Sequence, residues 1–293
     1  MPTVLITGTS RGIGLETALA FARAGHTVFA TMRNPSASPA LAEIASREQL
    51  PIIIYTMDVD SDVSVSSTIT EIQQTHGKID ILVNNAGIER TGSIEETPFA
   101  HFREVMETNY FGVLRCMQAV IPEMRKRRSG CIINVSSVAG RIASAPLTPY
   151  MASKWALEAL SEGVAGEMKM FNVRVAIIEP GIIDTDMARN IRDCDSTSPY
   201  PHRERFSAIF TAALKHPTPP SLVAQKILEV AESDDWQLRH PVGPDGAPFL
   251  QWRNSMSDEE WVAYNASDNE TFFKNFERDF GLSAQPQAEV TKA

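Results

Sequence analysis

The sequence predicts an α/β fold in which helices cover both faces of a doubly wound parallel sheet. Short apolar, β-branched runs alternate with longer stretches of helical periodicity, as is typical of parallel strands joined by right-handed helical crossovers. A glycine-rich turn, Gly8 to Gly14, also follows the first strand and opens the first helix, an order typical of nucleotide-binding sheets. The predicted strands are Thr3–Thr7, Thr27–Thr31, Pro51–Met57, Ile79–Val83, Cys131–Val135, Val173–Glu179 and Gln237–Val242.

Helical patterns fill the intervals between these strands. The first begins near Leu15 and ends at Gly25, and a long one covers residues 99–126, where Pro122 should produce a kink. Ser257 and Glu260 form a capping box, which predicts a helix start. That helix is predicted to run from the capping box to Asn265. A further helix starts near Ser61, and three others cover Ala152–Met168, Ser221–Ser233 and Thr271–Phe280.

No repeat or composition shift divides the 293 residues, so residues 1–282 are predicted to form one domain. Residues 186–220 are interpreted as a substrate lid, with a short helix packed on the body as the alternative. Residues 243–282 are a C-terminal extension, and the polar end, residues 283–293, is expected to be disordered. Met187, Ile191, Phe206 and Phe210 would give the lid an apolar side.

Composition narrows the range of partners and compartments. The net charge of −9 argues against nucleic acid and anionic membrane surfaces. The three cysteines, Cys116, Cys131 and Cys194, lack metal-ligand spacing and suit a reducing compartment, so we expect no metal site and a cytoplasmic location. The N-terminus runs straight into the first strand, and we expect neither a leader segment nor a membrane span.

The glycine turn predicts a dinucleotide cofactor. Gly8, Gly12 and Gly14 would let backbone N–H groups and the positive end of the helix dipole approach a pyrophosphate. An acidic residue ending the second strand would bind the ribose hydroxyls of NAD, but Arg33 stands there and suits a 2′-phosphate. Arg11 could reach the same phosphate, so NADP(H) is favoured over NAD(H). The alternative for each arginine is a solvated surface charge.

Further polar side chains follow the ends of later strands. Asp58 could accept a hydrogen bond from the adenine amino group, or cap the next helix. The run from Asn84 to Gly87 consists of residues that favour a turn, and its small Ala-Gly pair also lets a flat ring pass close to the backbone. Because the carboxyl ends of parallel strands meet at one edge of the sheet, Gly8, Asn85, Ser137 and Pro180 should converge on one crevice.

Tyr150 and Lys154 are four residues apart, so a helix places them on one face. The Lys ammonium is expected to lower the phenol pKa from about 10 toward the working range, which makes Tyr150 a candidate general acid/base. Ser137 is positioned to hold the reacting oxygen. Asn109, an unfavourable mid-helix residue, could hold a water that links Lys154 to solvent, or its side chain could be exposed or locally bonded. The spacing alone is weak evidence, since an aromatic ring under a Lys stem on a solvated helix would give it too.

These residues together resemble the short-chain dehydrogenase/reductase family over residues 3–185. The resemblance implies a single-domain Rossmann fold and hydride transfer between a nicotinamide and a carbonyl or alcohol. It implies that Tyr150 protonates the carbonyl oxygen, Ser137 hydrogen-bonds it, Lys154 lowers the Tyr pKa and holds the nicotinamide ribose, and Asn109 fixes a relay water. The implied cofactor residues are Gly8, Ser10, Arg11, Gly12, Ile13, Gly14, Arg33, Asp58, Val59, Asn85, Ala86, Gly87, Tyr150, Lys154, Pro180, Gly181, Ile183 and Thr185.

Residues 30–33 and 240–243 are also similar, more weakly, to the hydroxysteroid and retinol dehydrogenase branch. We therefore expect an NADP(H)-dependent reductase or secondary alcohol dehydrogenase. Its expected substrate is a small-molecule apolar carbonyl or alcohol, such as a steroid-, lipid- or secondary-metabolite-like compound. The family resemblance also implies a homodimer. Two alternatives stay open: an NAD-dependent alcohol dehydrogenase of the same family, and a non-catalytic NADP-sensing regulator.

Overall fold

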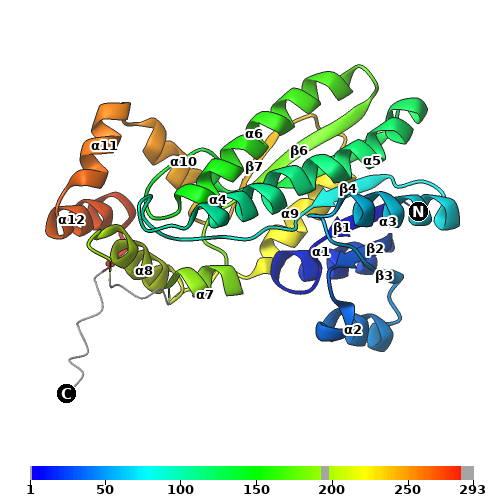
Figure 1. Ribbon diagram of the computed structural model, residues 1–293, viewed down its shortest axis with the longest axis horizontal. Helices are drawn as coiled ribbons and strands as arrows, with labels where there is room; N and C mark the ends of the chain where they lie inside the picture. Colours follow the sequence, from blue (N-terminus) through cyan, green and yellow to red (C-terminus); the bar gives the residue numbers. More distant parts are fainter. Residues whose placement is uncertain (1, 193–197, 285–293) are drawn as a thin grey trace.

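The computed structural model describes residues 2–192 and 198–284, and in this part of the chain seven parallel strands form one sheet (Figure 1). The strand order is β3-β2-β1-β4-β5-β6-β7. The chain builds first to one side of β1 and then to the other, so a crevice opens where β1 and β4 lie side by side. The strands are β1 (Thr3–Thr7), β2 (Thr27–Met32), β3 (Ile52–Thr56), β4 (Ile81–Asn84), β5 (Gly130–Val135), β6 (Val173–Pro180) and β7 (Arg239–Val242).

Helices cover both faces of the sheet, as predicted. Successive strand residues point to opposite faces. Val4 and Ile6 therefore pack in the core layer that includes α1 and α9, whereas Leu5 packs in the layer that includes α3, α5 and α6. The helices are α1 (Gly12–Arg23), α2 (Ala40–Glu48), α3 (Asp62–His76), α4 (Phe99–Met106), α5 (Gly112–Arg127), α6 (Thr148–Lys169), α7 (Asp186–Arg192), α8 (His202–Ala213), α9 (Pro220–Glu232), α10 (Gly246–Asn254), α11 (Asp258–Ala266) and α12 (Asn269–Phe280).

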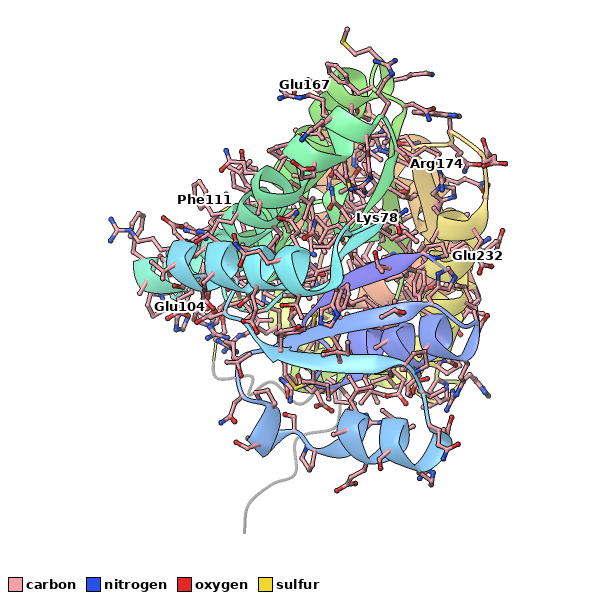
Figure 2. The ribbon with its side chains drawn as sticks, turned by 90° about the vertical axis from the view of Figure 1, so that its right-hand side faces the viewer. Lys78, Glu104, Phe111, Glu167, Arg174 and Glu232 are labelled. Carbon is pink, nitrogen blue, oxygen red and sulfur yellow. The ribbon has the colours of Figure 1, made fainter. Side chains whose placement is uncertain are left out.

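The long helix predicted over residues 99–126 is interrupted. A π-helical turn, η2 (Glu107–Phe111), separates α4 from α5. Such a turn adds one residue to the helical repeat, and Asn109 is buried within it. Pro122 lies inside α5. Figure 2 shows Phe111, at the end of the π-turn, on the outer side of this helical layer.

Two further differences concern a helix start and a helix that was not predicted. Helix α6 begins at Thr148, four residues before the predicted start, because proline is tolerated in a first helical turn and Pro149 stands there. Tyr150 is thus helical, and its four-residue spacing to Lys154 places both side chains on one face of α6, as expected. Helix α10 was not predicted, since the glycines and prolines between Gly243 and Pro248 resemble turn residues.

A third apolar cluster lies at one end of the molecule, where α8, α11 and α12 gather in Figure 1. It joins the segment predicted as a lid to the C-terminal extension. Ala284, within the tail expected to be disordered, is 3% exposed and packs in this cluster, while residues 285–293 lie outside the described part. No helix in residues 2–192 and 198–284 is long and apolar enough to cross a membrane.

Candidate active site

One cavity of about 600 Å³ runs past the carboxyl ends of the strands. All eighteen residues predicted to contact the cofactor line it, and so does Ser137. Asn109 does not line the cavity and lies behind it. The prediction that Gly8, Asn85, Ser137 and Pro180, each after a predicted strand, would meet in one crevice is therefore confirmed.

The glycine turn needs glycine for steric reasons. Gly8 and Gly12 have φ angles of +71° and +58°, a region that side-chain-bearing residues rarely adopt. A Cβ at Gly14 would lie 2.2 Å from the Gly8 carbonyl oxygen and 2.4 Å from Asn85 Nδ2. Helix α1 begins at Gly12 without a side-chain cap, so its first turn has the form of an anion-binding helix N-terminus. This cradle fits a pyrophosphate.

Asn85 and Thr7 fix the turn against β4. The Asn85 amide nitrogen donates to the carbonyl oxygens of Thr7 (2.9 Å) and Gly8 (3.1 Å). The Thr7 hydroxyl accepts from the backbone N–H groups of Asn85 and Ala86, both at 3.0 Å. The sequence indicated turn chemistry at Asn85. In the structure its side chain also holds the turn of a neighbouring strand.

Arg33 also lines the cavity and is exposed. Arg11 lies within the glycine turn and pairs with Asp186 at 2.9 Å. Both side chains of this pair are at least half exposed, so water screens it and it can exchange for another anion at little cost. Asp58 is not a helix cap, because the Ser61 side chain caps α3. Asp58 Oδ1 instead accepts from the Asp60 N–H at 3.1 Å.

Tyr150 and Lys154 lie together on α6. The Lys154 ammonium is 5.6 Å from the centre of the Tyr150 ring and donates to the Val135 carbonyl at 2.8 Å. Ser137 follows β5, where its hydroxyl oxygen accepts from the Ala139 N–H at 3.1 Å. The structure thus brings three of the four predicted catalytic residues to one wall of the cavity.

The electrostatics differ from the sequence expectation. Burial raises the pKa of Tyr150 to about 12, although a hydrogen bond with Ser137 lowers it. The expected net shift of this pKa toward the working range is therefore wrong for the protein alone, since the desolvation of the phenolate outweighs the favourable contacts. Burial likewise lowers the pKa of Lys154 to about 8, against the opposing effect of Glu158. Lys154 still carries its charge at neutral pH.

Asn109 connects three segments from inside the π-turn. Its amide nitrogen donates to the Ile88 carbonyl and to the Ser153 hydroxyl, both at 2.9 Å, and its amide oxygen accepts from the Ile88 N–H at 2.9 Å. Protein groups thus use both amide hydrogens. A water relay through Asn109 would have to use the second lone pair of its oxygen.

A buried charged cluster behind Lys154 was not predicted. Glu158 lies one turn after Lys154 and pairs with Arg239 of β7 at 3.0 Å. Glu179, 1% exposed, has Arg141 at 3.6 Å and Arg239 at 3.9 Å. Burial raises the pKa of Glu179 to about 7, and the nearby Glu158 raises it further. Nothing local in the sequence signals this cluster, because its members come from four separate segments.

Asp245, just before α10, was also missed. Its carboxylate accepts from the Ile182 N–H at 2.7 Å. A Cβ at Gly181 would lie 2.1 Å from the other oxygen of Asp245. Gly181 is therefore required because a carboxylate from the extension occupies the space beside it. The extension in this way holds the Pro180-Gly181 turn.

The remaining wall of the cavity is aromatic. Phe206 and Phe210 line it, as do the predicted lid residues Met187 and Ile191. The sequence did not predict a contribution from the extension, which supplies six more lining residues: Phe249, Trp252, Trp261, Asn265, Phe272 and Phe276. Among the described residues, no group of three His, Cys, Asp or Glu side chains could hold a metal ion.

Comparison with known proteins finds relatives over most of the chain. A family model described as short chain dehydrogenase matches residues 2–196. Retinol dehydrogenase 8 from Bos taurus is 39% identical over 68% of this chain and 64% of its own. An NADPH-dependent pterin aldehyde reductase from Arabidopsis thaliana is 41% identical over 63% of this chain and 76% of its own.

Solved structures give the same result. A short-chain dehydrogenase from Streptomyces avermitilis has a TM-score of 0.77 at 29% identity, covering 90% of this chain and 95% of that one. A gluconate 5-dehydrogenase from Burkholderia cenocepacia J2315, in complex with NADP and tartrate, has a TM-score of 0.68 at 28% identity. This match covers 78% of the present chain and 88% of the other.

The buried cluster yields a prediction of pH-dependent stability. The Glu179 pKa, about 7 in the folded protein against 4.5 for the free group, means that between these values the folded state binds more protons than the unfolded state. The contribution of Glu179 to the free energy of unfolding therefore falls as pH rises from 4.5 to 7. Glu179→Gln should remove that fall and become more stable than wild type above pH 7, by up to about 3 kcal/mol.

Urea unfolding between pH 4.5 and 8 measures this difference. Glu162→Gln is the control, because Arg239 lowers the pKa of Glu162 and the sign of its effect should be opposite. Equal pH slopes for Glu179→Gln and wild type would contradict the assigned protonation.

Proposed function

The chain belongs to the short-chain dehydrogenase family, and from this premise we propose that it is an NADP(H)-dependent reductase of apolar ketones or aldehydes. It is an NAD(P)-dependent oxidoreductase acting on CH–OH groups. The observation that carries the proposal is the shared cavity, in which the glycine turn, Arg33 and the Tyr150 hydroxyl face one volume. Its apolar wall favours a hydrophobic substrate, and the same site would oxidise the corresponding secondary alcohol.

The cofactor, when bound, supplies hydride to a carbonyl carbon or accepts it from an alcohol. The glycine turn would hold the pyrophosphate, Arg33 the 2′-phosphate, and the turn from Pro180 to Thr185 the carboxamide. The N–H groups of α1 and the guanidinium of Arg33 provide the positive charge that these phosphates need.

Tyr150 donates the proton to the carbonyl oxygen during reduction. A pKa of about 12 keeps the phenol protonated at neutral pH, as a general acid requires. The Ser137 hydroxyl holds the same oxygen, and the Lys154 ammonium stabilises the phenolate left after transfer. Lys154 would also hold the nicotinamide ribose, and Asn109 would fix a water that returns the proton.

Tyr150→Phe should lower kcat by roughly a thousandfold, the size expected for loss of a general acid, while the NADPH dissociation constant stays within about twofold. Turnover is followed by NADPH absorbance and binding by fluorescence titration. Tyr55→Phe is the matched control, because Tyr55 lies on β3 with its hydroxyl on His76, outside the cavity. Near wild-type turnover in Tyr150→Phe would refute the mechanism.

Arg33→Asp tests the cofactor preference. Loss of a charge-assisted contact with the 2′-phosphate should raise the NADPH dissociation constant about 10- to 100-fold and should not weaken NADH binding. Arg47→Asp serves as control, since Arg47 is a similarly exposed arginine on α2 that does not line the cavity. Unchanged NADPH affinity in Arg33→Asp would favour the NAD-dependent alternative.

A homodimer through the α4–α6 face is also proposed. Helix α4 and the π-turn η2 pack against α6, and these elements carry exposed apolar side chains: Phe99 (69%), Phe111 (42%) and Trp155 (48%). Trp155→Glu should convert the dimer to monomer in analytical ultracentrifugation. Trp236→Glu, at a comparably exposed tryptophan elsewhere, should leave it dimeric. A wild-type monomer at micromolar concentration would exclude the dimer.

A reducing, cytoplasmic compartment remains our proposal for location. Cys116 and Cys131 are free and buried, and burial raises the pKa of both thiols, which keeps them protonated and unreactive. Cys194 lies outside the described residues.

A further inference from the structure

We propose that α8 and the extension helices α10–α12 form an aromatic subsite for the far end of the substrate, and that this end is a neutral ring system carrying a hydroxyl recognised by Asn265. The inference rests on the proposed function and specifies its substrate class. The aromatic subsite is defined by Phe210, Phe249, Trp252, Trp261, Phe272 and Phe276, all of which line the cavity.

The subsite is held beside the Tyr150 end of the cavity. The Trp261 indole N–H donates to the Ala143 carbonyl at 2.8 Å, in the loop between Ser137 and Tyr150. Leu147 and Ile142 of the same loop line the cavity too. A substrate whose carbonyl reaches Tyr150 would therefore extend its other end toward Trp261, away from the glycine turn.

The walls of the subsite favour flat rings over flexible chains. Trp252 lies edge-on to Trp261 with ring centroids 4.9 Å apart, and Phe272 and Phe276 are nearly parallel, with an interplanar angle of 11°. Aromatic surfaces in these orientations present both faces and edges to a bound ring. Contacts of this kind add about 0.5–1.5 kcal/mol per pair beyond the burial of apolar area.

The charge of the lining excludes ionised substrates from this end. In the described part of the chain, each cavity-lining residue after Asp186 is neutral. The nearby guanidinium of Arg205 does not line the cavity, and its three nitrogens donate to Asn269, Asn265 and Ser267. A carboxylate or phosphate in the subsite would lose its hydration without gaining a partner. The bound end must be uncharged.

Asn265 is the polar exception among the lining residues of the extension. Its amide nitrogen donates to the Trp261 carbonyl at 2.9 Å, and in the described part of the chain no group donates to its amide oxygen. The indole N–H groups of Trp252 and Trp261 are already used by Asp279 and Ala143. Asn265 thus has its amide oxygen and one amide N–H left for a ligand, and a hydroxyl can donate to the first and accept from the second.

The shape of the subsite is fixed by a buried clamp. Arg205, 2% exposed on α8, reaches the end of α11, the turn after it and the start of α12 through its three hydrogen bonds. Its guanidinium stacks over Phe272 at 4.6 Å. The four helices thus form a preorganised wall. A preformed aromatic wall can discriminate between substrates because it does not adjust to each of them.

The test compares four ketones that share a methyl ketone group: acetophenone, acetylnaphthalene, hydroxyacetylnaphthalene, and a straight-chain methyl ketone with the carbon number of acetylnaphthalene. Wild type should prefer acetylnaphthalene over the chain at least fivefold in kcat/KM, and the hydroxylated form further by about fivefold. Phe276→Leu should lower kcat/KM for the naphthyl ketones about five- to tenfold and spare acetophenone.

Two comparisons control for general destabilisation. Phe273→Leu changes a neighbouring phenylalanine of α12 that packs in the same cluster but does not line the cavity, and it should alter no preference. Asn265→Leu should abolish the preference for the hydroxylated ketone while keeping that for the ring.

Binding of naphthol, followed by quenching of tryptophan fluorescence, gives a readout independent of turnover. Binding that weakens about fivefold in Asn265→Leu supports the subsite even if no ketone reacts, in which case the proposed function alone fails. Turnover of all ketones without a ring or hydroxyl preference, or equal effects of Phe276→Leu and Phe273→Leu, would overturn the subsite and leave the proposed function standing.

Discussion

The parallel register of the sheet is the constraint on which the site depends. β1 pairs with β4 and β4 with β5 in register, so these three strands end at one edge and deliver Gly8, Asn85 and Ser137 to one place. Inside the sheet, the Asn84 amide donates to Asn134 at 2.8 Å, and the Asn134 amide donates to Ser161 of α6 at 2.8 Å. These buried hydrogen bonds would be costly to leave unmade. They tie the helix that carries Tyr150 and Lys154 to the two central strands.

The extension is part of the site. Asp245 holds the turn after β6, Trp261 holds the loop before α6, and Arg205 joins α8 to the segment after α11. The contacts of Asp245 and Trp261 link the extension to loops that border the cavity. The walls on either side of Tyr150 therefore depend on residues that come after the last strand.

Much of this arrangement was predictable from the sequence, because its signals are local. Strand and helix periodicity located each strand, and the turn from Gly8 to Gly14, the Tyr150–Lys154 spacing and the Ser257 capping box each carry a mechanism within a few residues. The similarity of residues 30–33 to the retinol dehydrogenase branch agrees with the relative found in Bos taurus.

What was not predictable depends on contacts between distant segments. The direction of the Tyr150 pKa shift follows from desolvation in the folded protein, which composition does not reveal, and the Glu179 cluster assembles from separate elements. The π-turn at Asn109 reflects hydrogen bonds to Ile88 and Ser153, across the fold. The aromatic wall was missed because its residues alternate with charged ones in short helices that, in sequence, suggest only surface packing.

The contact between Gly181 and Asp245 limits how the protein can be remodelled. The space beside Gly181 is filled by the Asp245 carboxylate. A side chain at position 181 and a carboxylate at position 245 therefore exclude each other, although the two positions are 64 residues apart in the chain. An extension transplanted from a relative into this core would leave the Ile182 N–H without its acceptor unless it brought an acceptor to that position. A change of substrate preference made by replacing the extension of such a scaffold therefore requires that the turn after β6 and the extension be replaced together.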